Sequence, residues 1–147
     1  MDVDHLIEEL HGAPIRRIVE SRGWDYFRAE EKRVTQGIFR GDHLIIAPGG
    51  GAVLDPENVR AMKQNGRLIW LKARPEVLTE RMERDPRTPG SRPSLTGKKA
   101  MEEIGEVLAA RNPHYEGAAD LKIETSDLDV EGVVEKILAL LGEKKEN

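Results

Sequence analysis

Two carboxylates near the start of the chain, Asp2 and Asp4, are separated by a single residue. In an extended segment they would face opposite ways, so that one could hold a metal-bound water while the other accepts a hydroxyl proton. The structural alternative makes Asp4 the N-cap of a helix and leaves Asp2 in solvent. Further along, Arg28 and Glu31 are three residues apart, a helical spacing that by itself indicates an exposed ion pair.

Three consecutive glycines at positions 49–51 follow a short apolar run. Such a turn lets a ligand approach the backbone closely, although glycine-rich turns after strands are at least as often only turns. The C-terminal half is locally basic and could clamp a phosphate or carboxylate in bidentate fashion through Arg81, Arg87, Arg92 and Arg111. Solubility alone would explain several of these arginines.

The elements that must position these residues follow from caps and periodicity. The pattern predicts helices over residues 5–10, 15–20, 25–39, 56–66, 75–84, 98–111 and 130–141. Apolar runs predict strands over 44–47, 68–71 and 121–124, with the first two buried on both faces. Alternating strands and helices predict a three-layer α/β fold with a parallel sheet and ligands at the carboxyl ends of the strands.

Composition narrows the class of protein. A length of 147 residues fits a single domain, and a net charge of -4 has the wrong sign for a general nucleic-acid binder. The absence of cysteine excludes a disulfide scaffold and fits a reducing compartment. No apolar run is long enough to span a bilayer. We therefore expect one cytoplasmic domain over residues 1–147, with neither nucleic acid nor membrane as a partner.

Five short motifs occur in a fixed order along the chain. They are Asp2-Val3-Asp4, Phe27-Arg28-Ala29-Glu30-Glu31, Gly49-Gly50-Gly51-Ala52-Val53, Arg92-Pro93-Ser94-Leu95 and Arg111-Asn112-Pro113-His114-Tyr115. In this combination the sequence closely resembles the shikimate kinase family, from residue 2 to about residue 140. The resemblance implies a P-loop fold of the nucleoside-monophosphate-kinase type. It also implies transfer of the γ-phosphate of ATP to the 3-hydroxyl of shikimate, with Mg²⁺, in aromatic amino-acid biosynthesis, by a monomer.

The resemblance also implies roles for the acidic pair and for the nucleotide side. Asp4 would hold the shikimate hydroxyls and act as the base, and Asp2 would hold magnesium through water. Arg92 would move onto the phosphates from a mobile lid at residues 85–97, whose prolines exclude regular structure. Arg81 matches the position that lies against adenine.

For the substrate, the resemblance implies that Arg28 and Arg111 bind the shikimate carboxylate and that Glu31 orients Arg28. The residues that would lie against the ring are Gly49, Gly50 and Gly51. One position departs from the family pattern, because Trp24 follows Gly23 where glutamate is typical. The local support of Arg28 is therefore expected to be rearranged.

A larger departure concerns the phosphates, because no G-x-x-x-x-G-K-[ST] motif occurs in the sequence. In the family this loop precedes the Asp-x-Asp motif, so a strand, the loop and a helix of roughly 30 residues are expected to be absent. That strand would be central, between residues 44–47 and 68–71, and both of these would keep unpaired inner edges. We therefore expect Met1 to be an internal methionine or the chain to be a fragment that does not close its sheet alone.

Three other functions stay open. The chain could be a catalytically inactive shikimate-binding remnant or regulatory domain, which would bind shikimate without ATP. It could also be a related small-molecule kinase such as a gluconate kinase, although two arginines converging on a carboxylated ring favour shikimate. A purely structural role is the last alternative. Titration with shikimate, quinate and gluconate would distinguish these possibilities.

Overall fold

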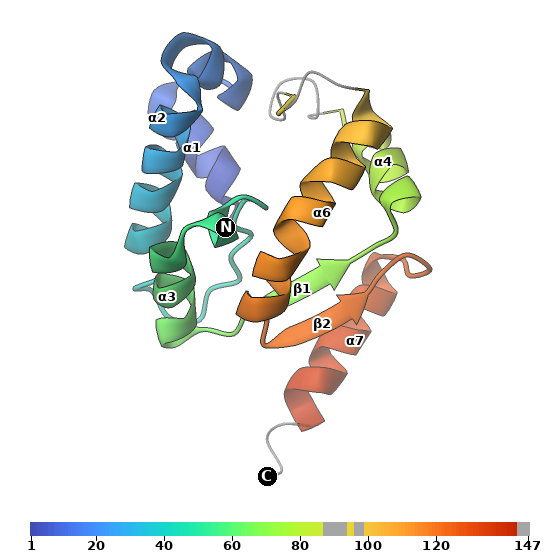
Figure 1. Ribbon diagram of the computed structural model, residues 1–147. Coiled ribbons are helices and arrows are strands. Elements are labelled where there is room, and N and C mark those ends of the chain that lie inside the picture. The colour runs from blue at the N-terminus through green and yellow to red at the C-terminus, as the bar shows by residue number, and fades with distance from the viewer. Residues whose placement is uncertain (87–93, 96–98, 144–147) are drawn as a thin grey trace.

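The computed structural model describes residues 1–86, 94–95 and 99–143. The first part of the chain is helical, with α1 (Val3–His11), α2 (Ile15–Ile38), the short 3₁₀ turn η1 (Ala52–Leu54) and α3 (Pro56–Asn65). The second part holds β1 (Ile69–Lys72), α4 (Pro75–Arg84), α6 (Ala100–Ala118), β2 (Leu121–Glu124) and α7 (Val130–Glu143). Figure 1 shows the two parts side by side, with α6 on the side of the second part that faces the first.

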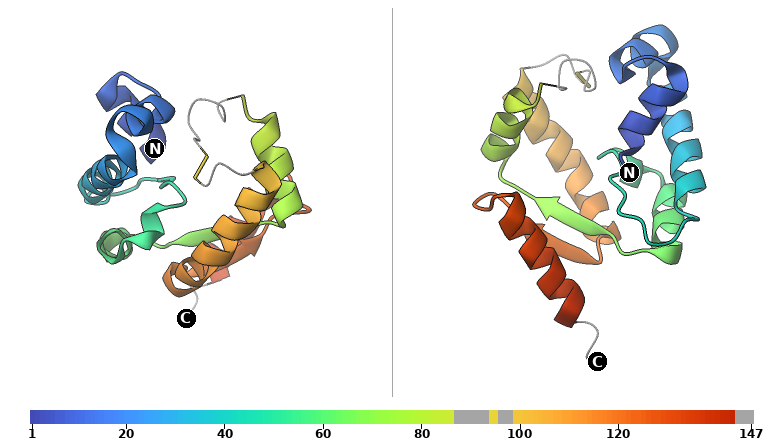
Figure 2. Two further views of the ribbon diagram at one scale, coloured as in Figure 1. Left: turned by 45° about the horizontal axis from the view of Figure 1, so that its top comes forward. Right: turned by 180° about the vertical axis from the view of Figure 1, so that it is seen from behind.

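The second part is built in layers around a parallel pair of strands. β1 and β2 run in register, with Ile69 opposite Leu121 and Lys72 opposite Glu124. Helix α6 crosses one face of the pair, and α7 lies against the opposite face, as the front and back views show (Figures 1 and 2). This arrangement confirms the predicted α/β class with a parallel sheet.

In the helical part, glycine and proline set the ends of α1 and α2. Gly12 ends α1 in the left-handed conformation (φ 59), and Pro14 stands immediately before α2. At Gly23 (φ 85, ψ 168) the backbone of α2 leaves helical geometry, so α2 is the two predicted helices meeting at a kink. The residues of the core between α1 and α2 are Val3, Ile7, Ile15, Ile18, Phe27 and Val34.

The strand predicted over residues 44–47 is wrong. In the part of the chain that the structure describes, this segment makes a single parallel bridge, between Ala47 and Asp2, and Ile45 is 91% exposed. A strand needs a neighbour along its length, and among the described residues the backbone bonds of this segment to another segment run to Met1 and Val3. β1 likewise pairs with β2 alone among the described strands, and Leu71 is 50% exposed. Among the described strands β1 therefore keeps an unpaired inner edge, as expected, whereas the burial expected on both of its faces is wrong. Residues 44–47 form no strand, so neither expectation holds for them.

The start of α1 also differs from the prediction. The N-cap is Asp2, not Asp4: Asp2 Oδ1 accepts from Asp4 N (3.0 Å) and from His5 N (3.3 Å). Backbone bonds to Ala47 hold Asp2 extended, so the helix can begin only after it. Asp4 consequently lies in the first helical turn, and the two carboxylates do not alternate along an extended segment.

Helix α6 continues past its predicted end at Arg111 and runs through Pro113 to Ala118. A proline inside a helix removes one backbone hydrogen bond and costs stability. Tertiary contacts of the last turn offset this cost, because Ala118 is 5% exposed and Tyr115 is bonded to the glycine turn. The helix 75–84 and the strand 121–124 have the predicted bounds, and the helices predicted over 56–66 and 130–141 are confirmed within two residues.

Arg92 and most of the predicted lid, residues 85–97, lie outside the described residues. Of the lid, the structure describes Asp85, Pro86, Ser94 and Leu95, and Ser94 Oγ donates to Glu103 Oε1 of α6 (2.7 Å). Within the described ranges, no helix combines the length and apolar character that crossing a membrane requires.

Candidate functional site

Side chains from three helices meet at the glycine turn, residues 49–51, between the bridge at Ala47 and η1. An alanine Cβ at Gly49 would lie 3.0 Å from both Asp4 Oδ1 and Glu31 Oε2. At Gly50 it would lie 3.0 Å from Tyr115 Oη and 3.4 Å from Arg111 Nη1. A side chain at Gly49 or Gly50 would therefore push these polar groups away by a few tenths of an ångström, so the turn packs closely against them.

Gly51 shows the closest approach of all. An alanine Cβ there would lie 2.5 Å from both Cζ and Nη2 of Arg28, far inside van der Waals contact. The backbone of Gly51 (φ -85, ψ -9) is in the ordinary right-handed region, so conformational strain is not the reason for a glycine here. Glycine is needed because the guanidinium lies flat against the turn.

Arg28 lies one turn beyond the Gly23 kink of α2 and is bound to Glu31, one turn later. Its Nη1 donates to both carboxylate oxygens of Glu31, at 2.8 and 3.0 Å. The Glu31 side chain is 2% exposed and that of Arg28 is 30% exposed. The predicted i,i+3 pair is therefore present, but it is half-buried at the turn rather than exposed on a solvated helix face.

The charge of Glu31 is balanced by two arginines. Burial raises the pKa of the Glu31 carboxyl above its usual value, because a low-dielectric surrounding disfavours the charged form. Arg28 and Arg111 act in the opposite direction and lower it. Glu31 takes only the Nη1 donor of Arg28, so two guanidinium groups beside one buried carboxylate can still bind a ligand carboxylate.

The unusual Trp24 supports Arg28. The Arg28 guanidinium carbon lies 5.4 Å from the centroids of both the Trp24 and the Phe27 rings, a cation-π distance. Trp24 and Phe27 themselves pack edge to face, with centroids 5.8 Å apart. The departure from the family pattern at position 24 therefore replaces a charged neighbour of Arg28 with an aromatic one.

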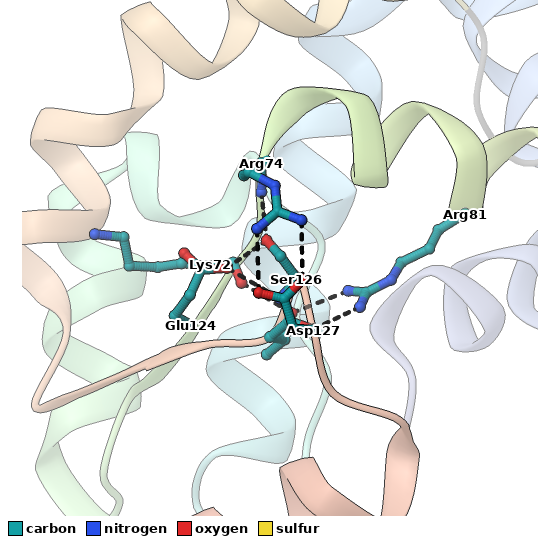
Figure 3. Close-up of polar contacts among 7 residues, drawn as sticks. Lys72, Arg74, Arg81, Glu124, Ser126 and Asp127 are labelled. Atoms are coloured by element: carbon teal, nitrogen blue, oxygen red, sulfur yellow. Dashed lines mark hydrogen bonds and ion pairs between the residues drawn. The ribbon is translucent and has the colours of Figure 1, made fainter.

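A second polar cluster lies where β1 and β2 end, and Arg81 belongs to it. From α4, Arg81 Nη1 donates to Thr125 Oγ1 (2.9 Å) and Nη2 to Thr125 O (2.8 Å). Arg74 pairs with Asp127 through two hydrogen bonds of 3.0 and 3.3 Å (Figure 3). Within the described residues, the guanidinium hydrogen bonds of Arg74 and Arg81 run to Asp127 and Thr125 rather than to the glycine turn. The structure thus places Arg81 at the carboxyl ends of the strands, apart from Arg28.

Asp2 offers one carboxylate oxygen to a hydrated magnesium ion. Asp2 is exposed, and its Oδ1 already accepts two backbone N–H groups, which leaves Oδ2 for a water of a hydrated cation. Among the described residues, no group of three or more acidic, histidine or cysteine side chains could hold a metal ion. Proteins often bind Mg²⁺ with one carboxylate, several waters and the phosphates of the substrate, so Asp2 fits the role of holding the ion through water.

Most of the residues singled out from the sequence meet at one place. The structure brings together Asp4, Arg28, Glu31, Gly49, Gly50, Gly51 and Arg111. Arg81 belongs to the second cluster, Asp2 caps α1, and Arg92 lies outside the described residues. The sequence analysis gave no role to Tyr115, the last residue of the Arg111 motif. Tyr115 follows Arg111 by four residues, a spacing that places both side chains on one face of a helix, and this was the available signal.

Comparisons with known proteins show which family the chain resembles. A family model described as shikimate kinase matches residues 1–142. Shikimate kinase 2 of Yersinia enterocolitica is 38% identical over 145 residues, covering 99% of this chain and 82% of that protein. The shikimate kinase of Syntrophus aciditrophicus is 36% identical, covering 93% of this chain and 74% of that protein.

Solved structures give the same result. A shikimate kinase from Acinetobacter baumannii in complex with shikimate superposes with a TM-score of 0.90 at 32% identity, covering 99% of this chain and 79% of that one. Shikimate kinase from Bacteroides thetaiotaomicron has a TM-score of 0.83 at 27% identity, with 97% and 82% covered. The family expected from the five motifs is therefore confirmed, and the chain belongs to the shikimate kinase family.

Proposed function

We propose that this chain binds shikimate at the glycine turn and serves its phosphorylation at the 3-hydroxyl by ATP. The observation that carries the proposal is the convergence of Arg28 and Arg111 on the turn that also holds Asp4 and Glu31. Two guanidinium groups suit one carboxylate, and a nearby carboxylate suits ring hydroxyls. Membership of the shikimate kinase family and the likeness to a structure solved with shikimate support this choice of substrate.

In the proposed complex, Glu31 holds Arg28 in place before the ligand arrives. Arg28 uses its Nη1 for both hydrogen bonds to Glu31. The other N–H groups of the guanidinium are therefore left for the ligand carboxylate. Asp4, half-buried in the first turn of α1, holds the hydroxyls and accepts the proton of the reacting one. Gly49, Gly50 and Gly51 let the ring lie against the backbone.

The nucleotide side of the proposal rests on residues outside the turn. Asp2 would hold Mg²⁺ through water, and the ion would neutralise charge on the transferring phosphoryl group. Arg81 would lie against adenine, since Thr125 fixes both ends of its guanidinium. We further propose a cytoplasmic monomer of one domain over residues 1–147, with residues 85–97 as the lid that brings Arg92 to the phosphates.

The test of the substrate is a calorimetric titration of this chain with shikimate, quinate and gluconate. We expect shikimate to bind most tightly, and Arg111→Gln to weaken it by at least about tenfold, the effect of losing a charge-assisted hydrogen bond. Arg74→Gln is the matched control, because it also breaks an arginine pair but in the second cluster. Preferential binding of gluconate, or equal effects of the two substitutions, would contradict the proposal.

A second candidate is shikimate binding without phosphoryl transfer. It differs from the first candidate only in the nucleotide side, since both use the glycine turn with Arg28 and Arg111 for shikimate. Incubating the chain with ATP, Mg²⁺ and shikimate and measuring ADP separates the two candidates. ADP formed in proportion to shikimate supports the kinase, and shikimate binding without ADP supports the second candidate.

A further inference from the structure

Tyr115 makes a long-range contact that the binding scheme above does not use. It lies in the last turn of α6, one helical turn after Arg111, and is half-buried. Its hydroxyl donates to Gly50 O at 2.7 Å, between residues 65 positions apart in the sequence. The contact therefore joins α6, which carries one ligand-binding arginine, to the centre of the glycine turn.

The other two carbonyls of the turn are satisfied locally. Gly49 O accepts from Ala52 N (2.9 Å), and Gly51 O accepts from Leu54 N (3.1 Å). These bonds form within the turn and η1, so they fix the local bend but not its position relative to α6. Gly50 O differs, because its donor comes from another element.

The Tyr115 bond also sets the orientation of a peptide group at the site. In a trans peptide the C=O and the N–H point in opposite directions, so fixing Gly50 O fixes the direction of the Gly51 N–H. Arg111 packs against Gly50 and Arg28 against Gly51. Rotation of this one peptide would therefore move the backbone relative to both guanidinium groups.

The tyrosine ring is held by the sheet. Its centroid lies 5.3 Å from that of Trp70 in β1, with the rings tilted by 37°. Lys72, the last residue of β1, covers Trp70 with its ammonium 4.8 Å from the ring centroid. The hydroxyl is thus placed by a helix and a strand, which are more rigid supports than a loop.

We propose that Tyr115 is a positioning residue for shikimate: its hydroxyl holds the Gly50 carbonyl so that the turn keeps a fixed position between Arg28 and Arg111. The inference rests on the proposed shikimate site. In this role Tyr115 acts through the backbone of the turn, because its hydroxyl proton is donated to Gly50 O.

The test compares Tyr115→Phe with Tyr26→Phe, since these are the two tyrosines of the chain. Tyr26 lies on α2 against the His11 ring and Arg22, so its substitution is the matched control. Shikimate is titrated by calorimetry well below the melting temperature, so that every variant is folded. Under these conditions a substitution that lowers only the global stability leaves the Kd for shikimate unchanged. We expect Kd to rise about fivefold in Tyr115→Phe, the effect of one hydrogen bond, and to stay unchanged in Tyr26→Phe.

Amide hydrogen exchange gives a second readout of positioning. In Tyr115→Phe, the amides of Ala52 and Leu54 should exchange several-fold faster while those of α1 keep their rates. If wild type binds shikimate and Tyr115→Phe binds it equally well, the inference is wrong and the proposed function stands. If wild type does not bind shikimate, the proposed function is wrong and the inference falls with it.

Discussion

Gly51→Ala should disable the candidate site through a single methyl group. The new Cβ would lie 2.5 Å from Cζ and from Nη2 of Arg28, whereas ordinary contact begins near 3.4 Å. The guanidinium must therefore move by about 1 Å, which is large compared with the tolerance of a hydrogen bond. Its bonds to Glu31, at 2.8 and 3.0 Å, cannot both persist after such a shift.

The expected cost follows from the burial of Glu31, which is 2% exposed. A buried carboxylate that loses its partner is destabilising by about 3–5 kcal/mol, and the partial exposure of Arg28 reduces this value. We expect the free energy of unfolding to fall by about 2 kcal/mol at pH 7 and the Kd for shikimate to rise by at least about tenfold. Because Gly51 has ordinary backbone angles, strain from the alanine adds nothing to this effect.

Urea unfolding and shikimate titration measure both effects. Gly105→Ala is the matched control: Gly105 lies within α6 with no atom near its Cβ position, so alanine should stabilise the protein by up to about 1 kcal/mol. Combining Gly51→Ala with Arg28→Ala should cost less than the sum of the two, because both remove the same ion pair. A Gly51→Ala variant with wild-type stability and affinity would refute the close packing of Arg28 on the turn.

Three further predictions concern the scaffold around the site. Hydrogen bonds from Arg33 and then His11 lower the pKa of the Glu30 carboxyl from 4.5 to about 2, so its stabilising effect is present above pH 4.5 and is lost as the pH falls toward 2. Acid unfolding followed by circular dichroism should therefore show a shallower pH dependence in Glu30→Gln, and an unchanged profile would contradict the pairing. Gly12→Ala should lower the free energy of unfolding by about 1 kcal/mol in urea, because φ is 59 at this helix end. Asp55→Ala removes the acceptor of the Glu57 N hydrogen bond (2.8 Å) and should lower the free energy of unfolding in urea by about 1 kcal/mol. An unchanged free energy of unfolding would show that this helix cap does not contribute to stability.

Sequence signals within a segment correctly predicted the bounds of some helices and strands. The helix 75–84 begins with a proline at its first position, and the strand 121–124 alternates buried and exposed residues, so both have the predicted bounds. The run 44–47 has the composition of a buried strand but pairs only at Ala47. Its state depends on which backbone lies beside it, and the residue types of a segment do not specify its neighbour.

The site divides in the same way. The sequence by itself determined the family, because five motifs occur in a fixed order along the chain. The same motifs identified the charged residues and the three glycines of the candidate site. Only the tertiary structure decided that Asp4 is within the first helical turn, that Trp24 supports Arg28, and that the Arg111 helix extends far enough for Tyr115 to reach Gly50. The physical reason is that the start of α1 depends on the bridge between Asp2 and Ala47, and the Tyr115 bond joins α6 to the glycine turn. Trp24 and Arg28 lie on the same helix, but the position of the guanidinium between Trp24, Glu31 and Gly51 depends on the packing of α2 on the turn. The energies of these contacts exist only once packing has brought the partners within hydrogen-bond or van der Waals distance.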